Sequence, residues 1–207
     1  MAREAIKLLS ATSGGAYTAS VQEYVVIRDY LLSRIMLANA NRPCLLANML
    51  VIDIMNARKV DDCMVVLVAK HKTAWTQGPA KIVLTESVYS WLRLFVTKIL
   101  PKTCNRSRSR HVFVTFNGED MKSAQITKAL QAMWKKANIN DKITCTLVRK
   151  TAVSTVHREA PAMTSNLADL MCHRTQTAAK CYRMVNREKN LCCSGKDVIR
   201  SYWNKYK

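Results

Sequence analysis

The chain has 207 residues, 33 of them Lys or Arg and 14 Asp or Glu, which gives a formal net charge of +19 and a pI near 9.9. This length supports one well-packed domain with at most a small appendage. A hydrophobic content of 49% and only 5 Gly and 4 Pro exclude a disordered basic tail and disfavour many-turned all-β proteins. A compact domain this basic is typical of proteins that bind a polyanion, above all nucleic acid, and an anionic membrane is the alternative.

The first half of the chain predicts two helical stretches followed by a β-hairpin. Helical spacing of apolar residues begins at Val21 and ends before Pro43, and residues 44–57 form a second apolar, helical stretch. The β-branched run 63–69 predicts a strand, and the turn residues 76–79 lead into a returning strand over residues 81–84.

The second half of the chain predicts further helices around one short strand. Helical spacing over residues 88–99 is expected to end at Pro101, which is followed by a polar basic loop at 102–110. A short strand is predicted over 112–116, with a turn at Asn117-Gly118. The remaining predicted helices cover residues 123–137, 145–158 (ended by Ala160-Pro161), about 165–172, and a stretch that begins near residue 175.

These elements predict a mainly α fold with a small β-hairpin or sheet, which places the chain in the α+β class. We expect an N-terminal segment over residues 1–20, one domain over 21–190 and a basic C-terminal tail over 191–207. No internal repeat is visible.

Eight cysteines are present, but the sequence opens without the apolar run of a secretory signal, and no stretch reaches the length of a membrane span. Cys44 and Cys63 lie within apolar segments, where free thiols pack as small hydrophobic groups. We therefore expect a reducing compartment, the nucleus or the cytosol, and neither secretion nor a membrane partner.

Five basic or polar residues stand at the edges of predicted elements, namely Arg42, Lys72, Arg149, His173 and Tyr182. Each has an ordinary structural interpretation on its own. The arginines and the lysine fit solvated helix ends or a hairpin surface, His173 fits a half-buried imidazole, and Tyr182 fits a core aromatic ring with a solvated hydroxyl. Their order along the chain and the motifs around them decide between these interpretations and a shared site.

In this order the motifs resemble the catalytic domain of the tyrosine recombinases, the phage-integrase-like family. Arg42 in NRPCLLANML is similar to the family's first-arginine motif, and Lys72 in KHKTAWTQGPAKIVL is similar to its hairpin lysine. The segment TLVRK around Arg149 resembles the H-x-x-R box, and His173 precedes Tyr182 by nine residues, the family's spacing from its second histidine to the nucleophile. The resemblance spans about residues 25 to 187, and Lys70 remains an alternative to Lys72 as the hairpin lysine.

The resemblance implies a DNA breaking-and-rejoining fold and a DNA strand transferase that acts in recombination or integration without a cofactor or a metal. Tyr182 would attack a phosphodiester to form a 3′-phosphotyrosine intermediate. Arg42, Arg149 and His173 would stabilise the charge on the phosphate, and Lys72 would protonate the leaving 5′-oxygen. It also implies double-stranded DNA as the partner, with several copies of the chain assembled on it.

The helix that carries the nucleophile must be interrupted. An unbroken helix would separate His173 and Tyr182 by roughly 13 Å, too far to serve one phosphate, so a turn is expected near Arg174 and Thr175.

The sequence departs from the family pattern at positions that bear on activity. Thr146 stands where the first histidine is expected, with Lys150 as an auxiliary donor, and Leu45 replaces an acidic residue that braces the first arginine. Only about 40 residues precede Arg42. We therefore expect an isolated catalytic domain, or a copy from a eukaryotic mobile element or a domesticated one, that binds DNA weakly. The alternative is a catalytically impaired DNA-binding module derived from such an enzyme.

Other basic residues predict contacts with the DNA backbone. These candidates are Lys70, Arg106, Arg108, Arg110, Lys135, Lys136 and Arg174. The cluster of Cys172, His173, Cys181, Cys192 and Cys193 lacks the C-x2-C pairs of structural zinc sites, so no metal site is predicted.

Overall fold

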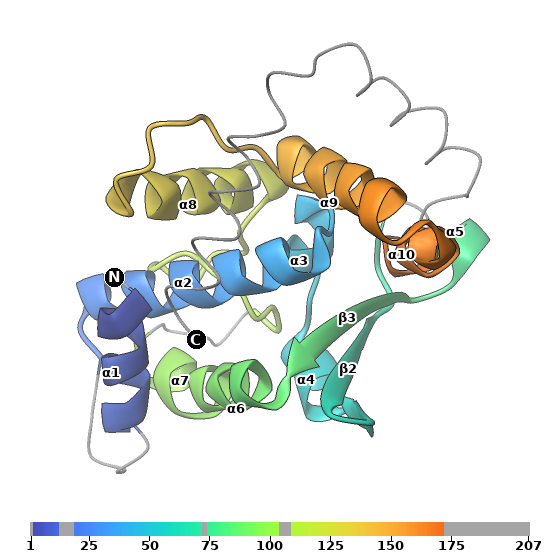
Figure 1. Cartoon of the computed structure of the whole chain (residues 1–207). Coiled ribbons are helices and arrows are strands. Elements are labelled where there is room, and N and C mark those ends of the chain that lie inside the picture. The colour runs from blue at the N-terminus through green and yellow to red at the C-terminus, as the bar shows by residue number, and fades with distance from the viewer. Residues whose placement is uncertain (1, 13–18, 72–73, 104–108, 172–207) are drawn as a thin grey trace. The chain divides into compact units, whose positions relative to one another are not determined.

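The computed structural model describes residues 2–12, 19–71, 74–103 and 109–171 (Figure 1). The chain divides into two units, Met1–Cys145 and Thr146–Lys207, and each is described by itself. The described residues are mostly helical and contain one three-stranded antiparallel sheet, which confirms the predicted α+β class.

The first unit is organised around α2 (Val21–Asn39), against which α1 (Ala2–Thr12) and α8 (Ser123–Lys136) pack. Ser20 caps α2, because its hydroxyl accepts the Glu23 N–H while the Glu23 carboxylate accepts the Ser20 N–H at 2.8 Å. Most of the length of α2 is buried, as expected for a central helix. The sequence analysis assigned no helix to residues 1–20, yet α1 forms and buries Ala5 and Leu9.

The apolar stretch 44–57 forms two short helices instead of the single one expected, α3 (Pro43–Ala47) and α4 (Val51–Met55). The backbone between them is drawn into pairing with a distant segment. Leu50 forms a bridge with His111, and the Val112 N–H donates to the Met49 carbonyl at 2.9 Å. The strand predicted over 112–116 is correspondingly reduced to isolated bridges, this one and Val114 with Asp120.

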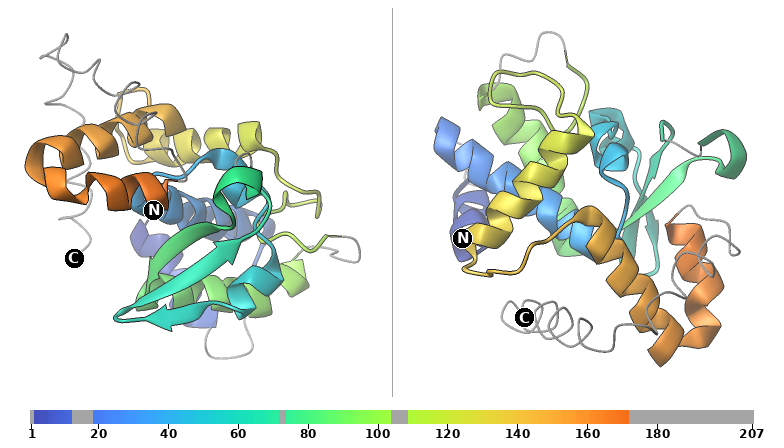
Figure 2. Two further views of the ribbon diagram at one scale, coloured as in Figure 1. Left: turned by 90° about the vertical axis from the view of Figure 1, so that its right-hand side faces the viewer. Right: turned by 90° about the horizontal axis from the view of Figure 1, so that it is seen from above.

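The sheet has the strand order β1 (Arg58–Val60), β2 (Cys63–Val68) and β3 (Ala80–Thr85), and both pairings are antiparallel. The register places Val66 opposite Ile82 and Val68 opposite Ala80, and these four side chains are buried on one face. The hairpin of β2 and β3 confirms the prediction, whereas β1 has no counterpart in the sequence analysis. Figure 2 shows the sheet from two further directions.

The hairpin connection contains a single helical turn, α5 (Ala74–Gln77), where a simple turn was expected. The Gly78 N–H donates to the Ala74 carbonyl at 2.9 Å, and Gly78 has a φ of 68°. Glycine adopts this left-handed conformation without steric cost, so the chain can leave the helical turn and enter β3.

The helix after the sheet continues past the proline expected to end it. It runs through α6 (Glu86–Leu94), the π-helical turn η1 (Phe95–Ile99) and α7 (Leu100–Thr103), with Pro101 inside α7. A proline ring normally clashes with the carbonyl four residues earlier. Here that residue, Thr97, lies in the wider π turn, which makes room for the ring.

In the second unit, α9 (Cys145–Glu159) is followed by the 3₁₀ turn η2 (Pro161–Met163) and α10 (Thr164–Leu170). The break at Ala160-Pro161 therefore lies where the sequence placed it.

Candidate functional site

Arg42 lies in the first unit at the N-cap of α3, with Pro43 as the first helical residue. Its side chain is half-buried, and among the described residues its guanidinium makes no hydrogen bond or ion pair. Leu45, in the position of the family's bracing acid, is 4% exposed and belongs to the core. Arg42 therefore keeps its donors available for an external anion, since no carboxylate of the described chain neutralises it.

The backbone just before Arg42 is held by Asn39, which is 1% exposed. The Asn39 side-chain amide donates to the Val83 carbonyl at 2.9 Å, and its carbonyl oxygen accepts the Val83 N–H at 2.7 Å. The same amide donates to the Ile35 carbonyl at 3.2 Å. Asn39 thus occupies the outer edge of β3 as a neighbouring strand would, and it joins the end of α2 to the hairpin.

The hairpin carries the lysines proposed as proton donors. Lys70 lies two residues after the end of β2 and is exposed, and Lys81 is exposed on β3 opposite Leu67. Lys72 lies outside the described residues. The Asn39 bridge therefore links the segment that bears Arg42 to the hairpin that bears Lys70.

Arg149 lies in the second unit on α9 and is 6% exposed. One of its terminal nitrogens donates to the Met171 carbonyl at 3.5 Å, so Arg149 ties α9 to the end of α10. Thr146 and Lys150 are exposed on α9. The hydroxyl and the ammonium that were expected to assist are therefore available to solvent.

Several of the predicted site residues lie outside the described residues, together with the turn expected near residues 174–175. They are Lys72, Arg106, Arg108, His173, Arg174 and Tyr182. Their roles stay predictions.

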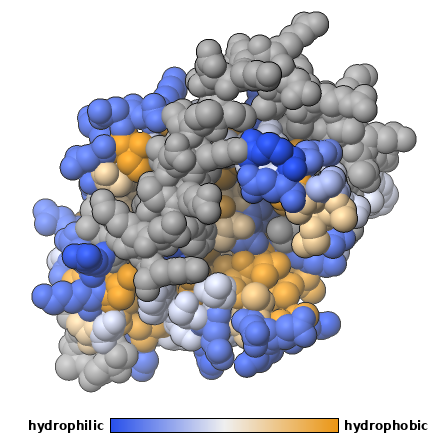
Figure 3. Space-filling view, in the orientation of Figure 1, coloured by the Kyte–Doolittle hydropathy of each residue, from blue (hydrophilic) through white to orange (hydrophobic). Residues whose placement is uncertain are grey.

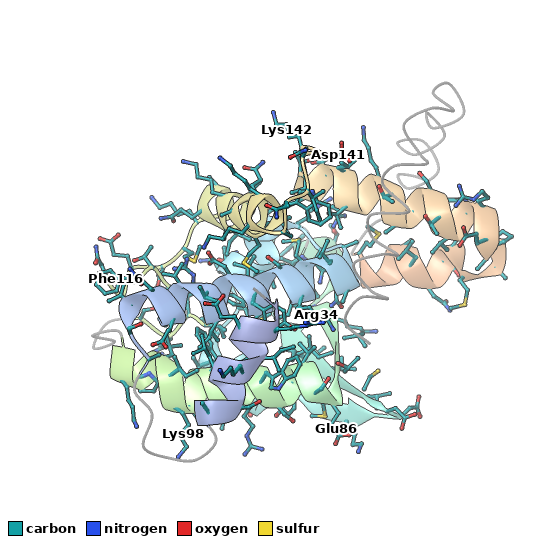
Figure 4. The ribbon with its side chains drawn as sticks, turned by 60° about the vertical axis from the view of Figure 1, so that its left-hand side comes forward. Arg34, Glu86, Lys98, Phe116, Asp141 and Lys142 are labelled. Carbon is teal, nitrogen blue, oxygen red and sulfur yellow. The ribbon has the colours of Figure 1, made fainter. Side chains whose placement is uncertain are left out.

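The described candidates for backbone contacts with DNA are exposed, and there are more of them than the sequence analysis named. Arg110 lies next to the Leu50–His111 bridge, and Lys135 and Lys136 end α8. Lys128, about two turns before Lys135 on the same face of α8, and Lys142 were missed, and Lys142 extends away from the ribbon (Figure 4). The signal for Lys128 in the sequence was its seven-residue spacing from Lys135, which places both on one face of the predicted helix. Lys142 lies beyond the end of α8, and no periodicity marked it.

A polar cluster fixes the loop that precedes α8. The Ser109 hydroxyl donates to Asp120 at 2.5 Å, and His111 Nδ1 lies 3.0 Å from the same carboxylate oxygen. Across the bridge, the carboxylate of Asp53 accepts the Leu50 N–H at 2.8 Å. Burial raises the pKa of Asp53, and this backbone bond and His111 act in the opposite direction. These groups bind one another and serve to hold α4 and the loop together.

No three His, Cys, Asp or Glu side chains in the described part of the chain gather where they could hold a metal ion, and Cys172, Cys181, Cys192 and Cys193 lie outside it. Among the helices that the structure describes, none is long and apolar enough to cross a membrane.

No family model and no curated protein sequence matches the chain. Solved structures do match it. The XerH site-specific recombinase bound to its palindromic difH substrate, in a post-cleavage complex, aligns with a TM-score of 0.61 at 13% identity and covers 98% of this chain. The XerA recombinase aligns with a TM-score of 0.55 at 18% identity, and a pre-cleavage complex of XerH with difH with a TM-score of 0.58 at 14%, each over 85% of this chain.

The chain spans about half the length of these proteins, covering 52%, 55% and 47% of them in the same order. At such low identities the likeness concerns the fold. The chain has the tyrosine recombinase fold, which confirms the fold inferred from the motifs.

Proposed function

We propose that this chain cleaves and rejoins DNA strands through a covalent 3′-phosphotyrosine intermediate on Tyr182. The observation that carries the proposal is the likeness of fold to the XerH recombinase, in an alignment that covers 98% of this chain, in a sequence whose motifs had separately suggested the same family. The half-buried Arg42 supports it, because a guanidinium without a carboxylate partner in the described chain is suited to bind a phosphate. The net charge of +19 supports a polyanionic substrate.

The chemistry of the step follows from the residue types. The Tyr182 oxygen forms a bond to phosphorus as the bond from phosphorus to the 5′-oxygen breaks, and the phenol proton passes to a base, a role that His173 can fill. The departing 5′-oxygen takes a proton from Lys72 or Lys70 and leaves as a hydroxyl. Arg42 and Arg149 balance the charge on the non-bridging oxygens. A free 5′-hydroxyl reverses the step, so rejoining needs no external energy source.

The experiment that tests this is incubation of the full chain with a nicked suicide DNA duplex, from which the short fragment that bears the free 5′-hydroxyl diffuses away, so that the adduct accumulates. We expect a protein–DNA adduct that resists denaturation and is absent for Tyr182→Phe. Arg42→Ala should lower adduct formation by about 10²-fold or more while DNA affinity changes little. DNA binding by the wild type without any adduct would refute the catalytic proposal and leave a binding module. An adduct formed by Tyr182→Phe would refute the assignment of the nucleophile.

We also propose a reducing compartment, nuclear or cytosolic, and assembly of several copies on DNA. Among the described cysteines, Cys44 and Cys63 are free thiols, which supports the first proposal. The second rests on the likeness to the recombinases. The domain limits at residues 20 and 190 likewise stay a prediction.

A further inference from the structure

Trp75 is the most exposed large apolar side chain among the described residues, with 99% of its surface accessible to solvent. Other exposed apolar residues, such as Ile52 at 56% and Met55 at 45%, lie on α4, where Figure 3 shows apolar surface beside the sheet. The next tryptophans along the chain behave differently, since Trp91 is half-buried and Trp134 is 7% exposed. Burying an indole in an apolar contact is strongly favourable, and a fully exposed indole does not gain this energy within the chain. Trp75 is therefore a candidate contact residue for a binding partner.

Trp75 is presented by a short, hydrogen-bonded tip. It lies in α5, at the end of the β2–β3 hairpin opposite to β1 (Figure 1). A ring nitrogen of His71 lies 2.8 Å from the Gly78 carbonyl and closes the base of the tip. The Ala74 N–H donates to the His71 carbonyl at 3.2 Å and starts the helical turn. The indole is therefore carried on a constrained turn, which lowers the entropy lost when it meets a partner.

The hairpin that carries Trp75 is purely cationic. The 23 residues from Cys63 to Thr85 contain three lysines and one histidine and no aspartate or glutamate. Lys70 and Lys81 are both exposed. An aromatic ring on a hairpin that also carries lysines is suited to bind nucleic acid. The lysines can contact the backbone phosphates, and the indole can stack on the flat face of a base. A second copy of the chain fits less well, because each copy carries a charge of +19.

We propose that Trp75 stacks on a DNA base that is unpaired or unstacked next to the strand being processed, while Lys70 and Lys81 hold the flanking phosphates. This proposal rests on the proposed function, because it requires DNA to be the substrate and adds that the hairpin tip contacts an unpaired base of that DNA. It implies that the chain prefers duplexes with a bulged or mismatched base over fully paired ones, since an already unstacked base carries no unstacking cost.

The test uses the full chain with Tyr182→Phe, so that binding is measured without cleavage, and two DNA duplexes that differ only in one bulged base. We expect the bulged duplex to bind more tightly and to quench the tryptophan fluorescence. Trp75→Ala should lose about 10- to 100-fold in affinity for it, and Trp75→Phe should keep most of the affinity. The matched control is Trp91→Phe, which removes an indole from α6 and should leave both affinity and quenching unchanged.

The outcomes separate this inference from the proposed function. If the wild type binds the duplexes but Trp75→Ala binds both equally well with its quenching intact, stacking by Trp75 is wrong and DNA binding stands. If Trp75→Ala changes only the sedimentation behaviour of the protein, the indole contacts protein instead of DNA, and the inference is overturned. If the wild type binds neither duplex, the proposed function and this inference both fail. Thermal melting of the Trp75→Ala and Trp75→Phe variants by circular dichroism should match that of their Tyr182→Phe parent, because Trp75 is 99% exposed and contributes no buried surface.

Discussion

Replacing Asn39 by alanine tests whether the edge of the sheet and the segment before Arg42 are held by one side chain. The substitution removes two hydrogen bonds to Val83 and one to the Ile35 carbonyl. It leaves the Val83 N–H and carbonyl without their partner at a position where water has limited access, since Asn39 is 1% exposed. A buried polar group without a partner costs about 1–3 kcal/mol.

The expected loss is therefore about 2–4 kcal/mol in the free energy of unfolding. For a chain of this size it corresponds to a fall in melting temperature on the order of 10 °C. The assay is urea unfolding followed by circular dichroism, together with hydrogen exchange of the Val83 amide, which should speed up in Asn39→Ala. The matched control is Gln131→Ala, which removes a side-chain amide that makes one hydrogen bond of 3.1 Å, to the Ile143 carbonyl. This control should cost about 1 kcal/mol.

A second variant makes the test depend on pH. Asn39→Asp keeps an acceptor for the Val83 N–H but turns a carboxylate oxygen toward the Val83 carbonyl. Repulsion and burial raise the pKa of the introduced carboxyl, so the folded state binds its proton more tightly than the unfolded state does. The stability of this variant should therefore rise, relative to Asn39→Ala, as the pH falls through the raised pKa. The reasoning is refuted if Asn39→Ala costs no more than Gln131→Ala and leaves exchange at Val83 unchanged.

Three further results are expected. Ala40 caps α2 in a left-handed conformation, with a φ of 47°, which is strained for a residue with a Cβ atom. Ala40→Gly should therefore raise the free energy of unfolding, measured by urea titration, by about 1 kcal/mol. A decrease in that free energy would show that the contacts of the Ala40 methyl group outweigh the strain. Burial raises the pKa of Asp29 above 3.8, against the opposing effect of its ion pair with Arg28. Stability should thus fall as the pH rises from about 3.8 through the raised pKa; Asp29→Asn should flatten this dependence, and an unchanged slope would contradict the assignment. Replacing Lys135 and Lys136 by glutamine should make the slope of log affinity for DNA against log salt less negative by up to about 1.8. The same change at Lys98, on η1 and extending away from the ribbon in Figure 4, serves as the control and should leave the slope as it was.

The sequence correctly predicted the helices and strands in which apolar residues follow a regular local pattern. The 3.6-residue spacing in α2, α8 and α9 and the β-branched run of β2 are local patterns, and they appear in the structure where they were expected. The motif around Arg42 was likewise correctly placed at the start of a helix, because Pro43 suits the first helical position and disfavours helix in the residue before it.

The errors occur where a distant segment outweighs the local pattern. Residues 44–57 are apolar enough for one helix, but Met49 and Leu50 pair with residues 111–112, and the helix is broken there. Pro101 lies within a helix because a π turn precedes it. Residues 111–112 lie far outside the window over which helical periodicity is read, so the pattern of residues 44–57 carried no sign of that pairing. The π turn lies close to Pro101, but a π turn has the same apolar spacing as the α-helix predicted there, so the pattern did not reveal it.

The sequence by itself determined the chemistry available to this protein. It carries a large positive charge, arginines suited to a phosphate, and a tyrosine at the recombinase spacing from a histidine. The tertiary structure decided which of these groups are free to act and what holds them. Arg42 has no carboxylate partner in the described chain, Asn39 ties its segment to the hairpin, and Trp75 is left in water at the hairpin tip. Residue types set what a side chain can do, whereas exposure and partnership depend on contacts between residues far apart in sequence, which exist only once the chain has folded.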